Sequence, residues 1–100
     1  MTESDKLDSV PVVHNIPAQR FELRIGTAIC VLDYRLAGEK MIIYHTEVPE
    51  SIEGRGLAAR LTRAALALAR AERLQVEPRC PYTAAFMQKN PEYSDLLRRR

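Results

Sequence analysis

The chain has 100 residues, of which 46% are hydrophobic and 28% are charged, and its formal net charge is +2. This length and composition are those of one globular domain, and no apolar run approaches the roughly 20 residues that a membrane-spanning helix requires. The basic residues are interleaved with acids and lack an aromatic platform, which argues against a nucleic-acid-binding protein. We therefore expect neither a membrane partner nor a nucleic-acid partner.

The two cysteines, Cys30 and Cys80, are too few for a disulfide framework, and together with two scattered histidines they give no zinc signature. We expect reduced thiols and no metal. The first residues carry acids and no apolar segment, so we expect no signal peptide and a cytoplasmic protein. The abundance of alanine and arginine is typical of a GC-rich bacterial genome, which predicts a bacterial source.

Residues 1–10 are polar and aperiodic, which predicts a disordered tail, and we assign residues 11–100 to a single domain. Pro11 and Pro17 bracket a short extended piece that leads into the fold. This piece contains His14, for which the sequence suggests no partner.

Three strands follow in succession. Apolar residues alternate with charged ones over Phe21–Ile25, a short Gly-Thr turn follows, and Ala28–Leu36 returns as a second strand. The apolar run Met41–Val48 predicts a third strand. Short polar turns between the strands indicate an antiparallel meander. We expect three side chains in the core: Cys30, Tyr44 and Phe86.

A glycine-bearing turn and a helix come next. Ser51 is a possible helix cap, and Gly54 and Gly56 flank Arg55 just before an apolar helical stripe. The stripe consists of Leu57, Ala58, Leu61, Ala64, Ala65, Leu68 and Ala69. The first N–H groups of a helix lack partners within the helix, and the helix dipole attracts anions to that end. The turn therefore predicts a phosphate-binding site that the backbone of the two glycines can approach closely.

The C-terminal third completes the predicted fold. Leu74–Pro78 is a short strand that should run parallel to the third strand, because it follows a crossover helix. Tyr82–Gln88 has helical spacing, and Pro91–Leu97 begins with a proline suited to a first helical position. The pattern β-β-β-α-β-α predicts an α/β (α+β) fold with one mixed, mostly antiparallel sheet and helices packed on it.

Four ordered pieces of the sequence resemble the minimal, single-domain GNAT-type N-acetyltransferases. The pieces are His45-Thr46-Glu47-Val48-Pro49, Gly54-Arg55-Gly56-Leu57-Ala58, Pro78-Arg79-Cys80-Pro81-Tyr82 and Asn90-Pro91-Glu92-Tyr93. The resemblance spans nearly the whole chain. It implies a GNAT-like fold without the usual first two helices, and it implies that acetyl-CoA or coenzyme A binds.

The resemblance also implies where the co-substrate lies. The pyrophosphate would rest on Glu53–Ala58, where Ser51 replaces the Gln or Arg of the family's fuller motif. The pantetheine arm would lie where the third and fourth strands splay apart. The implied cofactor-binding residues are Thr46, Val48, Glu53, Gly54, Arg55, Gly56, Leu57, Ala58 and Asn90. Asn90 could instead cap the preceding helix.

Acyl transfer to an amine requires a base for the amine, polarisation of the carbonyl oxygen and a proton for the leaving thiolate. Cys80 could carry the acyl group or supply that proton, or it could be a small buried hydrophobe. His45 and Glu47 share one face of a strand and could form the base, or His45 could be structural. Tyr82 could donate to the thiolate or serve as a packing aromatic.

These observations predict an N-acetyltransferase that moves an acetyl group from acetyl-CoA to an amine. The missing first helices predict an open acceptor site, which suits a protein or peptide amine. Direct attack of the amine is the usual course in the family, and an acyl-cysteine intermediate is the alternative. The competing function is a non-catalytic CoA-binding module that acts as a sensor or partner subunit.

Overall fold

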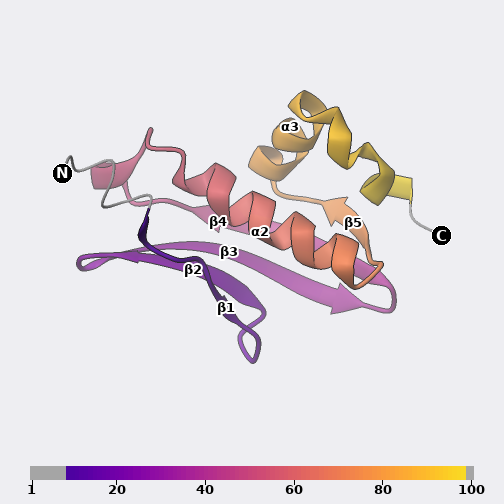
Figure 1. The fold of residues 1–100 in the computed structure, drawn as a ribbon, viewed down its shortest axis with the longest axis horizontal. Coiled ribbons are helices and arrows are strands. Elements are labelled where there is room, and N and C mark those ends of the chain that lie inside the picture. Colours follow the sequence, from indigo (N-terminus) through magenta and orange to yellow (C-terminus); the bar gives the residue numbers. More distant parts are fainter. Residues whose placement is uncertain (1–8, 99–100) are drawn as a thin grey trace.

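The computed structural model describes residues 9–98, and these form a five-stranded sheet with helices packed on it (Figure 1). The strands are β1 (Val13–Asn15), β2 (Arg20–Ile25), β3 (Ala28–Ala37), β4 (Lys40–Glu47) and β5 (Gln75–Pro78). The helices are α2 (Leu57–Ala71) and α3 (Pro81–Lys89), with 3-10 segments η1 (Glu50–Ile52) and η2 (Pro91–Arg98). Residues 1–8, the main part of the predicted tail, lie outside the described residues.

The sheet has the strand order β1-β2-β3-β4-β5. β1 to β4 pair antiparallel, and β5 pairs parallel to β4 after the crossover through α2. This confirms the predicted mixed, mostly antiparallel sheet. The extended piece around His14 forms β1, a strand in addition to the four that the sequence predicted, because it pairs with β2 from Val13↔Glu22 to Asn15↔Arg20.

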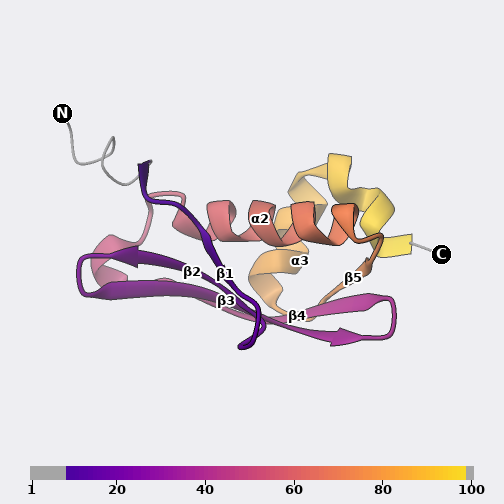
Figure 2. The same cartoon turned by 60° about the horizontal axis from the view of Figure 1, so that its bottom comes forward.

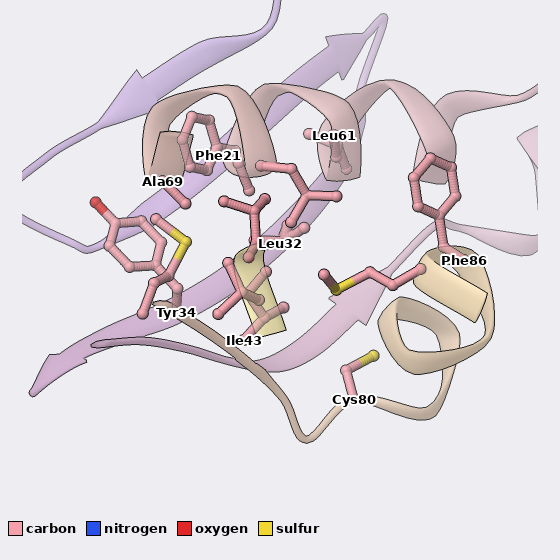
Figure 3. Packing of buried hydrophobic residues seen from close by; sticks show 14 of the residues in the cluster. Phe21, Leu32, Tyr34, Ile43, Leu61, Ala69, Cys80 and Phe86 are labelled. Atoms are coloured by element: carbon pink, nitrogen blue, oxygen red, sulfur yellow. The ribbon is translucent and has the colours of Figure 1, made fainter. Parts of the chain in front are cut away.

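Helix α2 lies along one face of the sheet, as Figure 2 shows. Four residues of its predicted apolar stripe, Leu57, Leu61, Ala65 and Ala69, are buried, whereas Ala58, Ala64 and Leu68 are half-buried and the fully buried Leu66 was not predicted. The buried residues pack with residues of β2 to β5 and of α3 and η2 in one hydrophobic cluster (Figure 3). Cys30 and Phe86 belong to this cluster, as predicted.

Tyr44 does not belong to the core, and the prediction that placed it there is wrong. Its side chain is 49% exposed. In the β3–β4 register Asp33 pairs with His45 and the next residue, Tyr34, pairs with Ile43, so Tyr44 is the extra residue of a β-bulge. A bulge reverses the alternation of side chains along the strand. Strict alternation from the buried Met41 and Ile43 therefore fails beyond this point.

The pairing of β4 with β5 ends just before this bulge. Their parallel pairing ends at Ile43↔Pro78, where Ile43 O accepts hydrogen bonds from Arg79 N–H (2.9 Å) and Cys80 N–H (3.0 Å). β4 continues to Glu47 and pairs there only with β3. Beyond Ile43, β4 thus runs on without β5, which ends at Pro78, and α3 begins three residues later at Pro81.

Several local predictions are refined by the structure. Ser51 lies inside η1 and does not cap α2, whose N-cap is Gly56. His14 has two partners that the sequence did not reveal: its Nε2 lies 2.6 Å from the hydroxyl of Tyr34, and its ring stacks on Phe21 with centroids 4.3 Å apart. These contacts fasten β1 to the sheet. Val10 also packs against the core.

Candidate functional site

The N-terminus of α2 presents backbone N–H groups without a capping side chain. Gly56 is the N-cap, with the left-handed φ of 74° that glycine adopts at little cost. The hydrogen bond from Arg60 N–H to Gly56 O, at 3.2 Å, closes the first turn of the helix, so the N–H groups of Leu57, Ala58 and Ala59 precede it. No acidic residue lies in the first turn. Within the described chain, this end of α2 thus has the polarity of an anion site.

A cleft of about 430 Å³ opens over these N–H groups. It is lined by Val48, Glu53, Gly54, Gly56, Leu57, Ala58, Ala59 and Tyr82. Six of the predicted cofactor-binding residues are in this set. Ala59 was missed by the sequence reasoning, although its position in the first helical turn was a usable signal. Arg55 is exposed beside the cleft and is not among its lining residues.

Cys80 lies at the N-cap of α3, at the edge of the hydrophobic cluster (Figure 3). It is 5% exposed, and its thiol donates to Thr46 Oγ1 at 3.5 Å. Burial raises the pKa of the thiol. The Thr46 hydroxyl, the N–H groups of Thr83 and Tyr82 and the Thr83 hydroxyl act in the other direction and leave that pKa below its ordinary value. Such a thiol is more readily ionised than a buried structural cysteine.

Cys80 and its partner Thr46 do not line the cleft, but residues two positions away from each of them do. Val48 lines the cleft, and Thr46 lies two residues earlier in the chain, about 6–7 Å along a strand. Tyr82, two residues after Cys80, also lines the cleft. Burial raises the pKa of the Tyr82 phenol, which favours its protonated, proton-donating form.

A smaller pocket of about 170 Å³ adjoins Tyr82 on the outer side of α3. Its other lining residues are Ala85, Phe86, Lys89 and Asn90. Asn90 is the C-cap of α3, and its side-chain amide donates to Phe86 O at 2.8 Å. Of the two roles that the sequence left open for Asn90, the capping role is thus present, and the side chain also reaches this pocket.

His45 and Glu47 lie together on the other face of the sheet. His45 Nε2 is 3.1 Å from Glu47 Oε1, and their side chains are 48% and 65% exposed. His45 pairs with Asp33 across the strands, whereas Thr46 pairs with Leu32, which belongs to the core beneath α2. The bulge therefore directs His45 and Glu47 away from the face that holds Cys80.

The predicted catalytic residues thus form two groups on either side of the splayed strands. Cys80, Tyr82 and Thr46 lie on the helix-covered face, and His45 and Glu47 lie on the exposed face. The sequence reasoning did not single out Thr83, whose hydroxyl favours the ionised form of Cys80 and so lowers the pKa of its thiol. Its spacing of three residues from Cys80, at the start of a helix, could have indicated it.

Comparison with known proteins gives consistent matches along the chain. The family model for GCN5-related N-acetyl-transferases matches residues 20–96. Protein NATD1 of Xenopus tropicalis is 32% identical over 90 residues, which cover 87% of this chain and 83% of that protein. Protein NATD1 of Danio rerio is 34% identical over 83 residues, covering 80% and 76%, and that of Homo sapiens is 32% identical over 85 residues, covering 82% and 75%.

A solved structure shares the fold. The solution structure of a GCN5-like protein from Staphylococcus aureus superposes with a TM-score of 0.72 and covers 87% of this chain and 86% of that one. Sequence identity is 21%, so this likeness concerns the fold alone. Over residues 9–98, the structure contains no helix long and apolar enough to cross a membrane.

Proposed function

The chain belongs to the GCN5-related N-acetyltransferase family, and from that premise we propose that it transfers an acetyl group from acetyl-CoA to an amine. The observation that carries the proposal is the uncapped N-terminus of α2 facing a cleft of about 430 Å³. This volume lies within the usual range for small-molecule sites. The amine acceptor that we favour is on a protein or peptide.

The first turn of α2 suits the pyrophosphate of acetyl-CoA. Free N–H groups of Leu57, Ala58 and Ala59 can donate to phosphate oxygens, and Gly54 and Gly56 leave the backbone open. Backbone donors suffice here, so the replacement of the family's Gln or Arg by Ser51 leaves this cradle in place. The nucleotide end of the same molecule would lie at the smaller pocket. Lys89 lines that pocket, and the Arg63 guanidinium lies over the ring of Phe86, which also lines it, so both cations can face phosphate groups there.

The two groups of polar residues support direct attack by the amine. Acetyl-CoA supplies an activated acyl carbon as a thioester. The amine nitrogen bonds to that carbon while the carbon–sulfur bond breaks. His45, paired with Glu47 on the exposed face, accepts the proton that the amine loses. Tyr82 in the cleft donates a proton to the departing thiolate.

Cys80 is the one residue that could change this route. Its sulfur lies 3.5 Å from Thr46 Oγ1, its pKa is lowered despite burial, and Tyr82, two residues later, lines the cleft. A thiolate there could attack the thioester itself and carry the acetyl group before passing it to the amine. We favour direct attack because the proposed base and proton donor lie on opposite faces of the splayed strands.

The exposed position of His45 and Glu47 supports an acceptor that is itself a protein or peptide. β1 to β4 follow one another through turns, with no helix between residues 13 and 47 to wall off this face. A lysine side chain on another protein can approach such an open face, whereas a small molecule would have few contacts to hold it.

A CoA-binding module without turnover is the second candidate, and two measurements separate them. Calorimetric titration of CoA tests binding, and consumption of acetyl-CoA with a lysine-peptide library tests transfer. Binding together with transfer supports the enzyme, and binding alone supports the module. If CoA binds only the folded state, 100-fold excess over Kd stabilises it by about 2.7 kcal/mol. A melting temperature unchanged by CoA would contradict both functions.

We also propose a cytoplasmic location and a bacterial source, on the composition arguments given above. The NATD1 relatives described here are vertebrate proteins, so the bacterial source rests on composition alone.

A further inference from the structure

The hydroxyl of Thr83 is buried without a hydrogen-bond partner. The residue is 0% exposed, and within residues 9–98 its Oγ1 is the single buried side-chain nitrogen or oxygen atom that has no partner. Leaving a buried hydroxyl unpaired costs stability, and native structures contain few such groups. Thr62 is equally buried but donates to Ala58 O at 2.8 Å. The unpaired hydroxyl of Thr83 therefore calls for a physical reason.

The surroundings of Thr83 indicate that reason. Cys80 is the N-cap of α3 and Thr83 is the third residue of that helix, a spacing at which the cap side chain and the third residue face each other. Thr46 on β4 lies on another side of the same sulfur, at 3.5 Å. The thiol has one proton and directs it to Thr46, and a neutral sulfur is a weak acceptor. Thr83 consequently has little to bind while Cys80 is protonated.

We propose that Thr83 is a positioning residue for an ionised Cys80, its hydroxyl held ready to donate to the sulfur once the thiol has lost its proton. The proton leaves to water, and the sulfur then carries the negative charge. Thr83 donates to this anion, and the Thr46 hydroxyl turns to donate as well. The N-terminus of α3 adds its positive end. Soft electrophiles, such as an acyl thioester or an alkyl halide, are the class of reactant that such a sulfur attacks.

The charged and titratable groups around Cys80 are consistent with this assignment. From α3 comes Tyr82, and from α2 comes Arg63, which acts electrostatically on Tyr82. Arg79, just after β5, pairs with Glu77 of that strand. The charged residues of β4 nearest in sequence, His45 and Glu47, project to the opposite face. The two threonine hydroxyls and the first N–H groups of α3 are thus the principal groups that stabilise the anion.

The inference deepens the proposed function, but its test needs no acetyl-CoA, so the two can fail separately. A thiolate absorbs in the ultraviolet, so the absorbance of the full chain can be followed as the pH is raised. Subtracting the same titration of the Cys80→Ser variant removes the contributions of Cys30 and the tyrosines and leaves that of Cys80. We would compare the wild type with Thr83→Val, which removes the hydroxyl, and with Thr83→Ser, which retains it. Thermal unfolding of each variant monitors the fold.

Thr83→Val should raise the titration midpoint of Cys80 by about one pH unit, the size of a hydrogen bond to a charged group. Thr83→Ser should keep the wild-type midpoint. Thr83→Val should also melt no lower than the wild type, because it removes an unpaired buried hydroxyl. A purely structural role predicts the reverse: a lower melting temperature and an unchanged midpoint. That pair of results, or equal midpoints in Thr83→Val and Thr83→Ser, would overturn the inference.

Discussion

Replacing Gly56 with alanine should separate ligand binding from backbone strain. Gly56 has φ of 74°, and a Cβ built on it meets no atom within 4 Å, so the new methyl group would enter the cleft that Gly56 lines. An L-residue in this conformation costs about 1–2 kcal/mol. In a domain of this size each kcal/mol lowers the melting temperature by roughly 4–8 °C.

Gly38 provides a matched control. It also has positive φ, 61°, and a Cβ there also meets nothing within 4 Å, but it lies in the β3–β4 turn, outside the cleft. Gly38→Ala should therefore lose a similar amount of stability and keep its affinity for CoA. Gly56→Ala should lose affinity as well, because the methyl group keeps phosphate oxygens away from the first N–H groups of α2.

The expected loss of affinity can be estimated from the contacts. A hydrogen bond to a charged group contributes about 1.5–3 kcal/mol, which corresponds to roughly a 10- to 100-fold weaker Kd for one such bond. Calorimetric titration of CoA into both variants, with melting temperatures measured in parallel, gives the comparison. Equal CoA affinity in the two variants would refute the cradle at Gly56 and the placement of the pyrophosphate on α2.

Three further predictions concern the two faces of the sheet and the core. His45→Ala and Glu47→Gln should each slow acetyl transfer and make its rate depend more steeply on pH in the alkaline range. The Kd for CoA measured by calorimetry should stay unchanged, because both side chains lie on the face opposite the cleft. A weakened Kd would contradict this separation. With acetyl-CoA and no acceptor, direct attack leaves no acetyl group on the protein by mass spectrometry, whereas a hydroxylamine-labile adduct on Cys80 and not on Cys30 would establish the acyl-cysteine route. Leu61→Ala should cost about 2–5 kcal/mol of unfolding free energy in urea, since Leu61 is 0% exposed beneath the sheet-facing side of α2, and a cost below 1 kcal/mol would be inconsistent with that packing.

The sequence predicted those parts of the fold that depend on periodicity and local turn chemistry. The helical stripe from Leu57 begins at the residue where α2 begins, because burial of one helix face constrains every third or fourth residue. The parallel pairing of β5 with β4 followed from the crossover helix between them. The cleft residues around Gly54 and Gly56 were accessible for the same reason, since the phosphate cradle is a property of contiguous backbone.

Features that depend on contacts between distant segments were not accessible. The partner of His14 is Tyr34, on a strand that the sequence does not connect to it. The unpaired hydroxyl of Thr83 becomes visible only when the packing around it is known. The predicted catalytic set was assembled by residue type, and no local pattern indicated that His45 and Cys80 lie on opposite faces.

The bulge makes Tyr44 the residue of β4 whose loss the sheet can accommodate. Deleting Tyr44 would close the bulge and place His45 directly after the inward-facing Ile43, so strict alternation would preserve the frame, with His45 and Glu47 on the exposed face and Thr46 and Val48 on the helix-covered face. Exchanging the exposed Tyr44 side chain for another residue leaves that frame intact. At this one position the strand therefore tolerates a change of length as well as a change of residue type, which is otherwise a property of surface loops.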